Sequence, residues 1–470
     1  MRIKADIRAE ARAGETLVRF FTRAQRAAIP TPVPDAEWPA APNSTLMLHH
    51  AGLLCVGLGD PARVTAQTLR AAAGTAVRTL LKAGRRSAAL DLREYPEWLA
   101  DAAAGAEMAA YVFQDFKAAK QPPMSSVRLI VKPRDLAEAR RAVRRGEIAG
   151  AAANIAREIG NKPGNVIYPE SLAAECRRIA KAEGLKITVL DEKALERGGY
   201  GGLMAVGSGS RRPPRLIILR HDGGKAGEAP IALVGKAITF DTGGISIKPA
   251  EKMEEMVFDK CGGMAVLGAM AGIARLKLKR NVVGLIASAE NMPSSEAYRP
   301  GDIVKTYDGT YVEVINTDAE GRMVLADAIA YARQDCKARA IVDLATLTGA
   351  CVVALGEYAA GLWSTDDALQ AALLAASGKT GERLWPMPLY EEYSEQIRSD
   401  VAAIKNTGGR PGGACTAAAF LKTFARDTPW AHLDIAPVAA ISKARPELAR
   451  GATGFGTRLL IDLVEAFARS

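Results

Sequence analysis

The chain has 470 residues, of which 49% are hydrophobic and 24% are charged, so it can bury the cores of two or more domains and has the composition of a soluble globular protein. Its net charge of +10 is concentrated in residues 1–150, where 23 Lys and Arg against 15 Asp and Glu give +8 and leave +2 for the rest. No uncharged stretch reaches the ~18 apolar residues of a membrane span, and the N-terminus lacks the apolar core of a secretion signal, so we expect a cytoplasmic protein with no membrane partner.

Cysteine and histidine usage restricts the available chemistry. The six cysteines are scattered and include no C-x-x-C pair, which favours buried reduced thiols over a disulfide framework or a thiolate zinc site. The four histidines form neither an H-E-x-x-H nor an H-x-x-E-H spacing. A catalytic metal in this protein would therefore depend mainly on oxygen ligands.

The N-terminal third is predicted to be a small α/β domain. A mixed-charge helix is expected first, followed by a proline-rich irregular segment that ends near residue 45. Strands and helices then alternate up to a long helix that stops at Gly160, shortly before a proline. We assign residues 1–134 to this domain, 135–160 to a connecting helix and 161–470 to a larger catalytic domain. The expected strands are 52–60, 87–92 and 126–132, and the expected helices are 61–83, 97–116 and 135–159.

Arginine residues account for much of the positive charge of this region. A run in the connecting helix has two interpretations: a solvated helix face, or a surface that contacts phosphates. The second interpretation makes DNA binding a secondary hypothesis. The run comprises Arg140, Arg141, Arg144 and Arg145.

The C-terminal part alternates helices and strands more regularly, which predicts a mixed, mostly parallel sheet flanked by helices. The whole chain is thus expected to be a two-domain α/β protein. The expected helices here are 170–183, 192–197 and 323–332, and the expected strands are 185–190, 215–220, 231–235, 282–289, 311–315 and 340–344.

Charged residues follow the buried strand 231–235, at the edge where open α/β sheets place ligands. Lys236 and Asp241 come first, and Gly243-Gly244 would let the backbone approach a ligand closely. Asp259 lies just ahead of an apolar helix that Cys261 is expected to open, where its simplest role is a favourable charge near the helix N-terminus.

The segment Asn316-Thr-Asp-Ala-Glu-Gly-Arg322 places two carboxylates and a guanidinium on alternate residues. In an extended segment, Asp318, Glu320 and Arg322 would project to the same side. A solvated acidic turn with a salt bridge to Arg322 is the simpler alternative. With Asp241 and Asp259, however, the chain offers four carboxylates whose convergence would be costly without cations, and two divalent metal ions would remove that cost.

Taken together, these segments resemble the leucyl aminopeptidase, or cytosol aminopeptidase, family. The resemblance covers roughly residues 155–460, and the N-T-D-A-E-G-R signature is specific; residues 1 to about 130 match no motif. The segments that carry it are 234–244 (VGKAITFDTGG), 297–302 (AYRPGD), 316–322 (NTDAEGR), 345–350 (ATLTGA), 406–413 (NTGGRPGG) and 430–436 (WAHLDIA).

The resemblance implies a metallo-exopeptidase that hydrolyses the N-terminal residue of peptides through a water bridging two divalent metals. By similarity, one more exchangeable metal is held by Asp241, Asp318 and Glu320, and one tighter metal by Lys236, Asp241, Asp259 and Glu320. Lys236 would have to be neutral, which two adjacent cations favour by lowering its pKa. Lys248 is implied to stabilise the oxyanion, and Arg322 to hold a bicarbonate that acts as general base. Substrate-binding positions are implied at Met256, Asn316, Ala319, Thr346 and Gly349.

Other properties follow from the same resemblance or stay open. The family implies a homohexamer and peptide substrates with a free N-terminus, and it leaves a preference for leucine-like residues undecided. The oxygen-rich ligand set suits Zn, Mn, Mg or Co and does not choose among them. Lys260 stands where many relatives have Met, which would affect the pocket edge or the metal preference; we expect His432 and Asp434 to be structural. A two-metal phosphoesterase is the alternative hydrolase, although its usual histidine-rich metal shell is missing.

Overall fold

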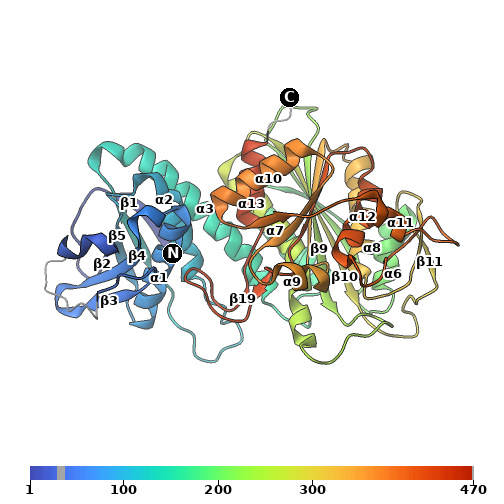
Figure 1. Ribbon diagram of the computed structural model, residues 1–470, viewed down its shortest axis with the longest axis horizontal. Helices are drawn as coiled ribbons and strands as arrows, with labels where there is room; N and C mark the ends of the chain where they lie inside the picture. Colours follow the sequence, from blue (N-terminus) through green and yellow to red (C-terminus); the bar gives the residue numbers. More distant parts are fainter. Residues whose placement is uncertain (29–37, 468–470) are drawn as a thin grey trace. The chain divides into compact units, whose positions relative to one another are not determined.

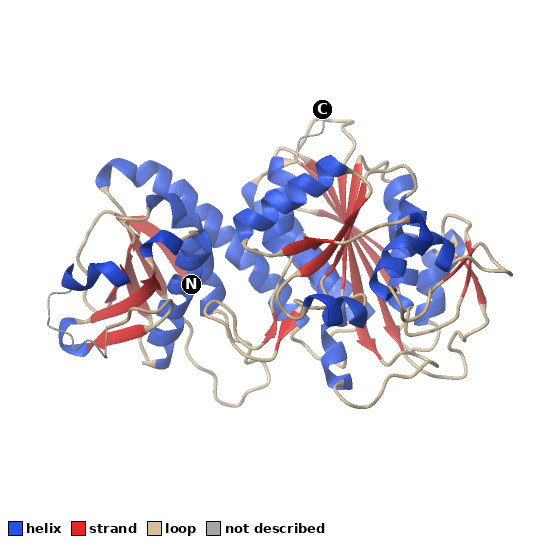
Figure 2. Cartoon of the chain, viewed as in Figure 1, coloured by secondary structure: helices blue, strands red, loops and turns tan. Residues whose placement is uncertain are grey.

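The computed structural model describes residues 1–28 and 38–467 and divides into two compact units. The first contains Met1–Asn154 and Ser442–Arg450, and the second contains Ile155–Ile441 and Gly451–Ser470. The division falls inside α3 (Leu136–Gly160), the helix that continues from the first unit into the second (Figure 1). Each unit has its own sheet with helices beside it, as the strands and helices of Figure 2 show, so the predicted two-domain α/β fold is confirmed.

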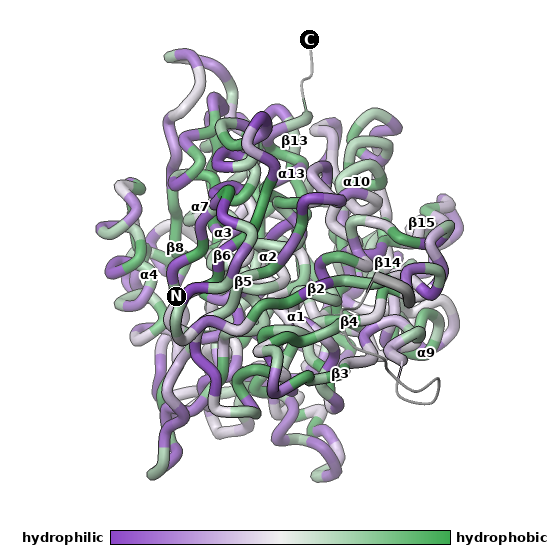
Figure 3. The backbone as a smooth tube through the Cα atoms, turned by 90° about the vertical axis from the view of Figure 1, so that its left-hand side faces the viewer, coloured by the Kyte–Doolittle hydropathy of each residue, from purple (hydrophilic) through white to green (hydrophobic). Residues whose placement is uncertain are grey.

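The first unit is built on a six-stranded sheet in the order β1-β6-β5-β2-β4-β3. All neighbours are parallel except β3 and β4. The seven residues of β4 are all buried, in keeping with the hydrophobic colour of this strand in Figure 3. The strands are β1 (Arg2–Asp6), β2 (Thr16–Thr22), β3 (Thr45–Leu48), β4 (Leu53–Gly59), β5 (Ser87–Asp91) and β6 (Ser126–Ile130), and the helices beside them are α1 (Ala66–Lys82) and α2 (Leu99–Ala110).

The mixed-charge helix expected at the start of the chain is wrong. Two strands, β1 and β2, take its place, and β2 lies inside the sheet between β5 and β4. The reason is visible in Thr16–Thr22, where β-branched and aromatic residues supply the side chains that a buried strand packs. Part of the predicted proline-rich segment lies outside the described residues.

The second unit contains an eight-stranded mixed sheet in the order β15-β14-β17-β13-β9-β10-β8-β7. Its centre, β17-β13-β9-β10, is parallel, and helices such as α7 and α8 pack against it. Parallel strands covered by helices have continuous apolar sequences, and this pattern allowed such strands to be predicted from the sequence. The strands are β7 (Lys186–Leu190), β8 (Arg215–Asp222), β9 (Ile231–Asp241), β10 (Asn281–Asn291), β13 (Ala340–Ala345), β14 (Ala360–Ser364), β15 (Leu384–Pro386) and β17 (Trp430–Asp434).

The helices of this unit surround the sheet, and two small sheets complete it. The helices are α4 (Pro169–Glu183), α5 (Glu192–Gly198), α6 (Gly201–Gly207), α7 (Cys261–Leu276), α8 (Glu320–Gln334), α9 (Gly349–Leu355), α10 (Asp367–Thr380), α11 (Glu391–Gln396), α12 (Gly413–Ala425) and α13 (Thr457–Ala466). The small sheets are β11 (Ile303–Lys305) with β12 (Tyr311–Glu313) and β16 (Ile404–Lys405), and β18 (Ala440–Ile441) with β19 (Gly451–Ala452).

Two predictions about the interior can be compared with the structure. All six cysteines are buried and free, as expected for reduced thiols. One helical stretch of the described chain, Met253–Leu276, is long and apolar enough to cross a membrane, but 83% of the apolar window is buried inside the protein. Its apolar character is therefore explained by packing in the core.

Candidate active site

Four polar side chains converge at the carboxyl end of β9. Lys236 lies within that strand and Asp241 ends it. Asp259 is carried by the 3-10 helix η7 (Met253–Lys260), and Glu320 opens α8. The parallel neighbours of β9 end at the same edge, so separate segments bring their charged residues to one place.

Lys236 lies among the carboxylates of this cluster. Asp241, Asp259 and Glu320 are all buried, and one oxygen of each lies within 4.8 Å of one oxygen of both others. The Lys236 Nζ is 2.8 Å from Asp259 Oδ1 and 2.7 Å from Glu320 Oε1, and it donates to the Thr346 carbonyl at 2.8 Å. Two of the three buried carboxylates thus pair directly with one ammonium, and the repulsion among the three is weakly screened because they are buried.

A second lysine connects Asp318 to the cluster. Lys248 Nζ lies 2.9 Å from Asp241 Oδ2 and also contacts Asp318 Oδ1. Asp318 is more open than the other carboxylates, with 33% of its side chain exposed. The structure therefore brings together all five residues predicted to bind metal, with Asp241 in contact with both halves of the set.

The predicted extended geometry of the signature segment is wrong. Asp318 lies in the turn before α8, but the helix already begins at Glu320. Residues two apart on a helix do not face each other, and Glu320 accordingly pairs with Lys236 while Arg322 donates to the Asn406 carbonyl at 2.8 Å. The Glu320 carboxylate and the Arg322 guanidinium therefore have different partners and do not form the simple salt bridge of the alternative interpretation.

The cluster retains protons in the absence of added cations. Burial, with repulsion from Asp241, raises the pKa of Glu320 to about 8 despite the nearby Lys236. Burial also raises the pKa of Asp259 to about 6, again against the attraction of Lys236. For Lys236, burial opposes the charged form, but Asp259, Glu320 and Asp241 outweigh it and raise the pKa. The neutral Lys236 expected from the sequence would thus require cations that replace its proton.

Metal binding at this cluster should release protons, so the affinity for a divalent ion should increase with pH. Below pH about 6, protons on Asp259 and Glu320 compete with the metal, and above pH about 8 these carboxylates are ionised. Calorimetric titration of the metal-free protein with Mn²⁺, in buffers of different ionisation enthalpy, measures this release. A binding heat independent of the buffer, with equal affinity at both ends of that pH range, would contradict it.

The donor set fits a divalent cation. Among the described residues, Asp259 Oδ2 is buried and accepts no hydrogen bond, although a buried carboxylate oxygen ordinarily has a partner. Glu320 Oε1 and Asp318 Oδ1 are likewise outside hydrogen-bond geometry and are approached only by the lysine ammonium groups. Carboxylate oxygens together with one amine nitrogen suit Zn, Mn, Mg or Co.

Arg322 is a buried cation beside the cluster. Its side chain is 6% exposed, and no ion pair to it is found in the described part of the chain. Burial lowers its pKa to about 10, although Glu320, Asp434 and Asp318 favour the charged form. The group remains protonated at neutral pH, and a small anion would compensate its buried charge.

A cavity of about 500 Å³ opens onto Lys248 and the five predicted metal ligands, whereas Arg322 is not among its lining residues. Of the predicted substrate-binding positions, Met256, Thr346 and Gly349 line it, whereas Asn316 and Ala319 do not. Asn316 instead accepts a hydrogen bond from the Asp318 backbone at 2.8 Å and so shapes the turn. Further lining residues escaped prediction although several adjoin the motifs 345–350 and 430–436; they are Lys252, Glu255, Phe258, Leu347, Thr348, Val352, Glu357, Ala436, Pro437, Ala439 and Ala440.

Lys260 does not line this cavity. Its side chain is fully buried, and its Nζ donates to the Lys162 carbonyl at 2.9 Å and contacts the Val257 carbonyl. Burial lowers its pKa to about 8. In this chain the residue ties η7 to the segment after α3, which differs from the pocket-edge position suggested by the sequence.

His432 and Asp434 belong to the core beside the site, as expected. His432 Nδ1 lies 2.6 Å from Asp343 Oδ1, and both side chains are fully buried. Asp434 accepts hydrogen bonds from Thr348 Oγ1 at 2.7 Å and from the Leu347 backbone at 3.1 Å. These contacts support the loop after β13 that carries Thr346.

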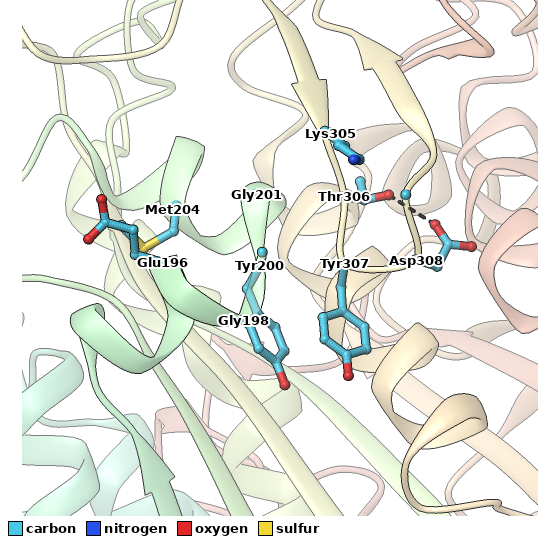
Figure 4. A pocket seen from close by; sticks show the side chains of 11 residues that line it. Glu196, Gly198, Tyr200, Gly201, Met204, Lys305, Thr306, Tyr307 and Asp308 are labelled. Atoms are coloured by element: carbon cyan, nitrogen blue, oxygen red, sulfur yellow. Dashed lines mark hydrogen bonds between the residues drawn. The ribbon is translucent and has the colours of Figure 1, made fainter.

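A second cavity, of about 690 Å³, lies elsewhere in the same unit. Tyr200 and Tyr307 stack in its wall with ring centroids 4.3 Å apart, and Thr306 Oγ1 lies 3.1 Å from Asp308 Oδ1 (Figure 4). Asp308 also pairs with Arg333 and Arg426. The Asp308 carboxylate of this larger cavity is thus paired with two arginines, unlike the carboxylate oxygens of the smaller cavity that accept no hydrogen bond.

The predicted basic surface lies on α3. Arg140, Arg141 and Arg144 are exposed and Arg145 is half-buried. Exposure is what both a solvated face and a phosphate-binding face require, so DNA binding stays a prediction.

Comparison with known proteins was made for the sequence and for the fold. The profile of the catalytic domain of the cytosol aminopeptidase family matches residues 154–461, and that of the family's N-terminal domain matches residues 37–120. The chain is 46% identical over 426 residues to a probable cytosol aminopeptidase of Syntrophotalea carbinolica, covering 88% of this chain and 86% of the relative. It is 42% identical over 468 residues to one of Geobacter sulfurreducens, covering 97% and 94%.

A solved structure shows the same fold. The bottromycin maturation enzyme BotP in complex with Mn superposes with a TM-score of 0.87 at 35% identity, covering 96% of this chain and 99% of that one. The similarity therefore extends through both units of the chain.

Proposed function

This chain belongs to the cytosol aminopeptidase family, and from that premise we propose that it removes the N-terminal residue of peptides with two divalent metal ions. The proposal assigns the ions to the buried cluster at the end of β9. One observation carries it: three buried carboxylates and a lysine meet in the lining of a cavity, and among the described residues no group donates a hydrogen bond to Asp259 Oδ2 or Glu320 Oε1. The proposed ligands are Lys236, Asp241, Asp259, Asp318 and Glu320.

The residues around the cluster suit peptide hydrolysis. Two bound divalent cations would lower the pKa of a water molecule and polarise the scissile carbonyl. Lys248 lines the cavity, and although burial opposes its charged form, Asp241, Glu320 and Asp318 raise its pKa, so its protonated ammonium can donate a hydrogen bond to the developing oxyanion. Arg322 would hold a bicarbonate as general base, which its buried guanidinium supports, because no ion pair to it is found among the residues that the structure describes.

Substrates are proposed to be peptides with a free N-terminus. Met256, Thr346 and Gly349 line the cavity and would surround the first side chain, while Asn316 and Ala319 are assigned to substrate binding by family similarity alone. Leu347, Val352 and Pro437 add apolar surface, which agrees with a leucine-like first residue.

Hydrolysis of leucine p-nitroanilide by the metal-loaded protein tests this function. We expect release of p-nitroaniline, and a decrease of at least ~100-fold in kcat/KM when the α-amine is acetylated, because the amine then loses its charge-assisted contacts. Equal rates on both compounds would contradict an exopeptidase. Turnover of p-nitrophenyl phosphate instead would favour the two-metal phosphoesterase, which the family match argues against.

The identity of the metals, the cellular location and the oligomeric state are also proposals. Zn and Mn are the proposed metals, with Mg or Co as alternatives, and the Mn complex of BotP supports Mn. We also propose a cytoplasmic homohexamer. Light scattering of the purified protein should give about six times the 49.7 kDa of one chain, and a monomeric mass would contradict this assembly.

A further inference from the structure

Asn291, the last residue of β10, contacts both segments that carry the proposed metal ligands. Its side chain is 1% exposed. The Nδ2 group lies 2.8 Å from Asp241 Oδ1 and 3.1 Å from the Thr317 carbonyl, and it donates a hydrogen bond to each. One amide therefore links the end of β9 to the turn that carries Asp318.

Thr317 is fixed from several directions at this point. Its carbonyl accepts a second hydrogen bond from the Tyr298 hydroxyl at 2.8 Å. Its own hydroxyl donates to the Gly243 carbonyl at 2.6 Å and accepts from the Ser246 backbone at 2.8 Å. The loop after β9 and the turn before α8 thus form one hydrogen-bonded unit. Of the side chains of Asn291, Tyr298 and Thr317, only that of Asn291 also donates a hydrogen bond to a proposed metal ligand.

The packing leaves Asn291 little freedom. Gly244 has a φ of +67°, and a Cβ added there would lie 2.8 Å from Asn291 Oδ1 and 3.0 Å from Thr317 Oγ1. Only glycine lets the backbone pass so close. The amide is held with its donor group toward Asp241, and the Asp241 carboxylate is oriented in turn.

We propose that Asn291 is a positioning residue that holds Asp241 and the Asp318 turn at the separation required for the two metal sites. This inference rests on the proposed function, because it concerns the same ligands. Partners of ligating carboxylates commonly contribute 10–100-fold to metal affinity. Within the described chain, none of the other three side chains that we assign to the tighter site, those of Lys236, Asp259 and Glu320, is hydrogen-bonded to Asn291, so the effect should pass through Asp241 and the turn.

The chain offers a matched control on the same strand. Asn281 begins β10, and its Nδ2 donates to the Lys225 carbonyl at 2.8 Å and the Glu228 carbonyl at 3.0 Å, away from the site. Asn291→Asp and Asn281→Asp each remove a doubly donating amide with almost no change of shape. Tyr298→Phe removes only the second donor to Thr317.

The test is a calorimetric titration of each metal-free full-length protein with MnCl₂, with thermal unfolding measured alongside. We expect Mn²⁺ affinity to fall about 10–100-fold in Asn291→Asp, to change less than about 2-fold in Asn281→Asp, and to fall by an intermediate factor in Tyr298→Phe. Asn291→Ala, which introduces no carboxylate, should weaken Mn²⁺ binding in the same direction and separates the loss of the donor from added repulsion.

Three outcomes would overturn the inference. Asn291 variants that unfold at lower temperature but bind Mn²⁺ like the wild type would show a purely structural role. An effect of Tyr298→Phe as large as that of Asn291→Asp would show that the contact to Asp241 is not what matters. Wild-type protein that binds no Mn²⁺, Zn²⁺, Mg²⁺ or Co²⁺ would overturn the proposed function together with the inference, whereas the first two outcomes leave that function intact.

Discussion

Replacing Glu320 with glutamine is expected to lower kcat/KM for leucine p-nitroanilide on the order of 10³-fold or more, which corresponds to a loss of about 4 kcal/mol of transition-state stabilisation. Glu320, like Asp241, is assigned to both metals, and its Oε1 lies 2.7 Å from Lys236 Nζ. Glutamine keeps the shape but offers a weaker, uncharged ligand. Steady-state kinetics at saturating metal measures the loss.

Glu382→Gln is the matched control for this variant. Glu382 is also buried, at 7% exposure, but it pairs with Arg458 at 3.5 Å and accepts from the Leu459 backbone away from the cavity. It should change kcat/KM less than about 3-fold, since it touches neither metal nor substrate. Wild-type activity in Glu320→Gln, or equal losses in the two variants, would remove Glu320 from the site.

Glu320→Gln should also change the thermal stability of the metal-free protein in a pH-dependent way. The pKa of Glu320 is raised in the folded protein to about 8, above its usual value of 4.5, so ionising it costs stability as pH rises between these values. Glutamine cannot ionise. Without metal, Glu320→Gln should therefore unfold at a higher temperature than the wild type near pH 8, and the difference should vanish below about pH 4.5.

Removing the metals is expected to abolish activity and to lower the thermal stability of the wild type. Without cations, burial and, to a smaller extent, repulsion from Asp241 disfavour the ionised carboxylates and raise the pKa of Glu320 and Asp259. Readdition of Mn²⁺ or Zn²⁺ should restore hydrolysis, and metal at about 100 times its dissociation constant should stabilise the fold by about 2.7 kcal/mol. Dialysis against a chelator, followed by activity assays and thermal unfolding, tests both effects.

Two comparisons control for side effects of the chelator. For the Mn-loaded protein, chelator already saturated with Mn²⁺ should leave the activity unchanged, and Asp259→Asn should gain less thermal stability from Mn²⁺ than the wild type because it lacks one proposed ligand. Full activity after exhaustive metal removal would contradict the proposed chemistry. Restoration by monovalent salt alone would contradict the divalent-metal requirement.

Most of the second unit could be predicted because its signals are local. Buried parallel strands such as β9 and β13 appear as short apolar runs bounded by turns, and Lys236 and Asp241 stand out against such a run. Strands β1 and β2 were missed because the charged residues of both signs around them suggested a helix and obscured the short apolar segment Thr16–Thr22. The β-propensity of a segment alone does not determine whether it becomes a strand of the sheet.

The site was predictable in its members and not in its geometry. The residues were found because they lie in sequence motifs. Their geometry was not, because α8 already begins at Glu320 and the side chains of Glu320 and Arg322 therefore point in different directions. Asn291 gave no signal at all, since an asparagine at a strand end is ordinarily a turn residue. Its role depends on the pairing of β10 with β9, which aligns Asn291 with Asp241 across 50 residues of sequence.

The central claim is that Lys236, Asp241, Asp259, Asp318 and Glu320 bind two divalent ions. Metal analysis of the active protein combined with anomalous scattering from Mn-loaded crystals tests it most directly. The claim predicts two ions per chain, ~3.5–4 Å apart, with oxygens of Asp241 and Glu320 coordinating both. An active enzyme with no ion at the end of β9, or with ions bound only elsewhere, would contradict it.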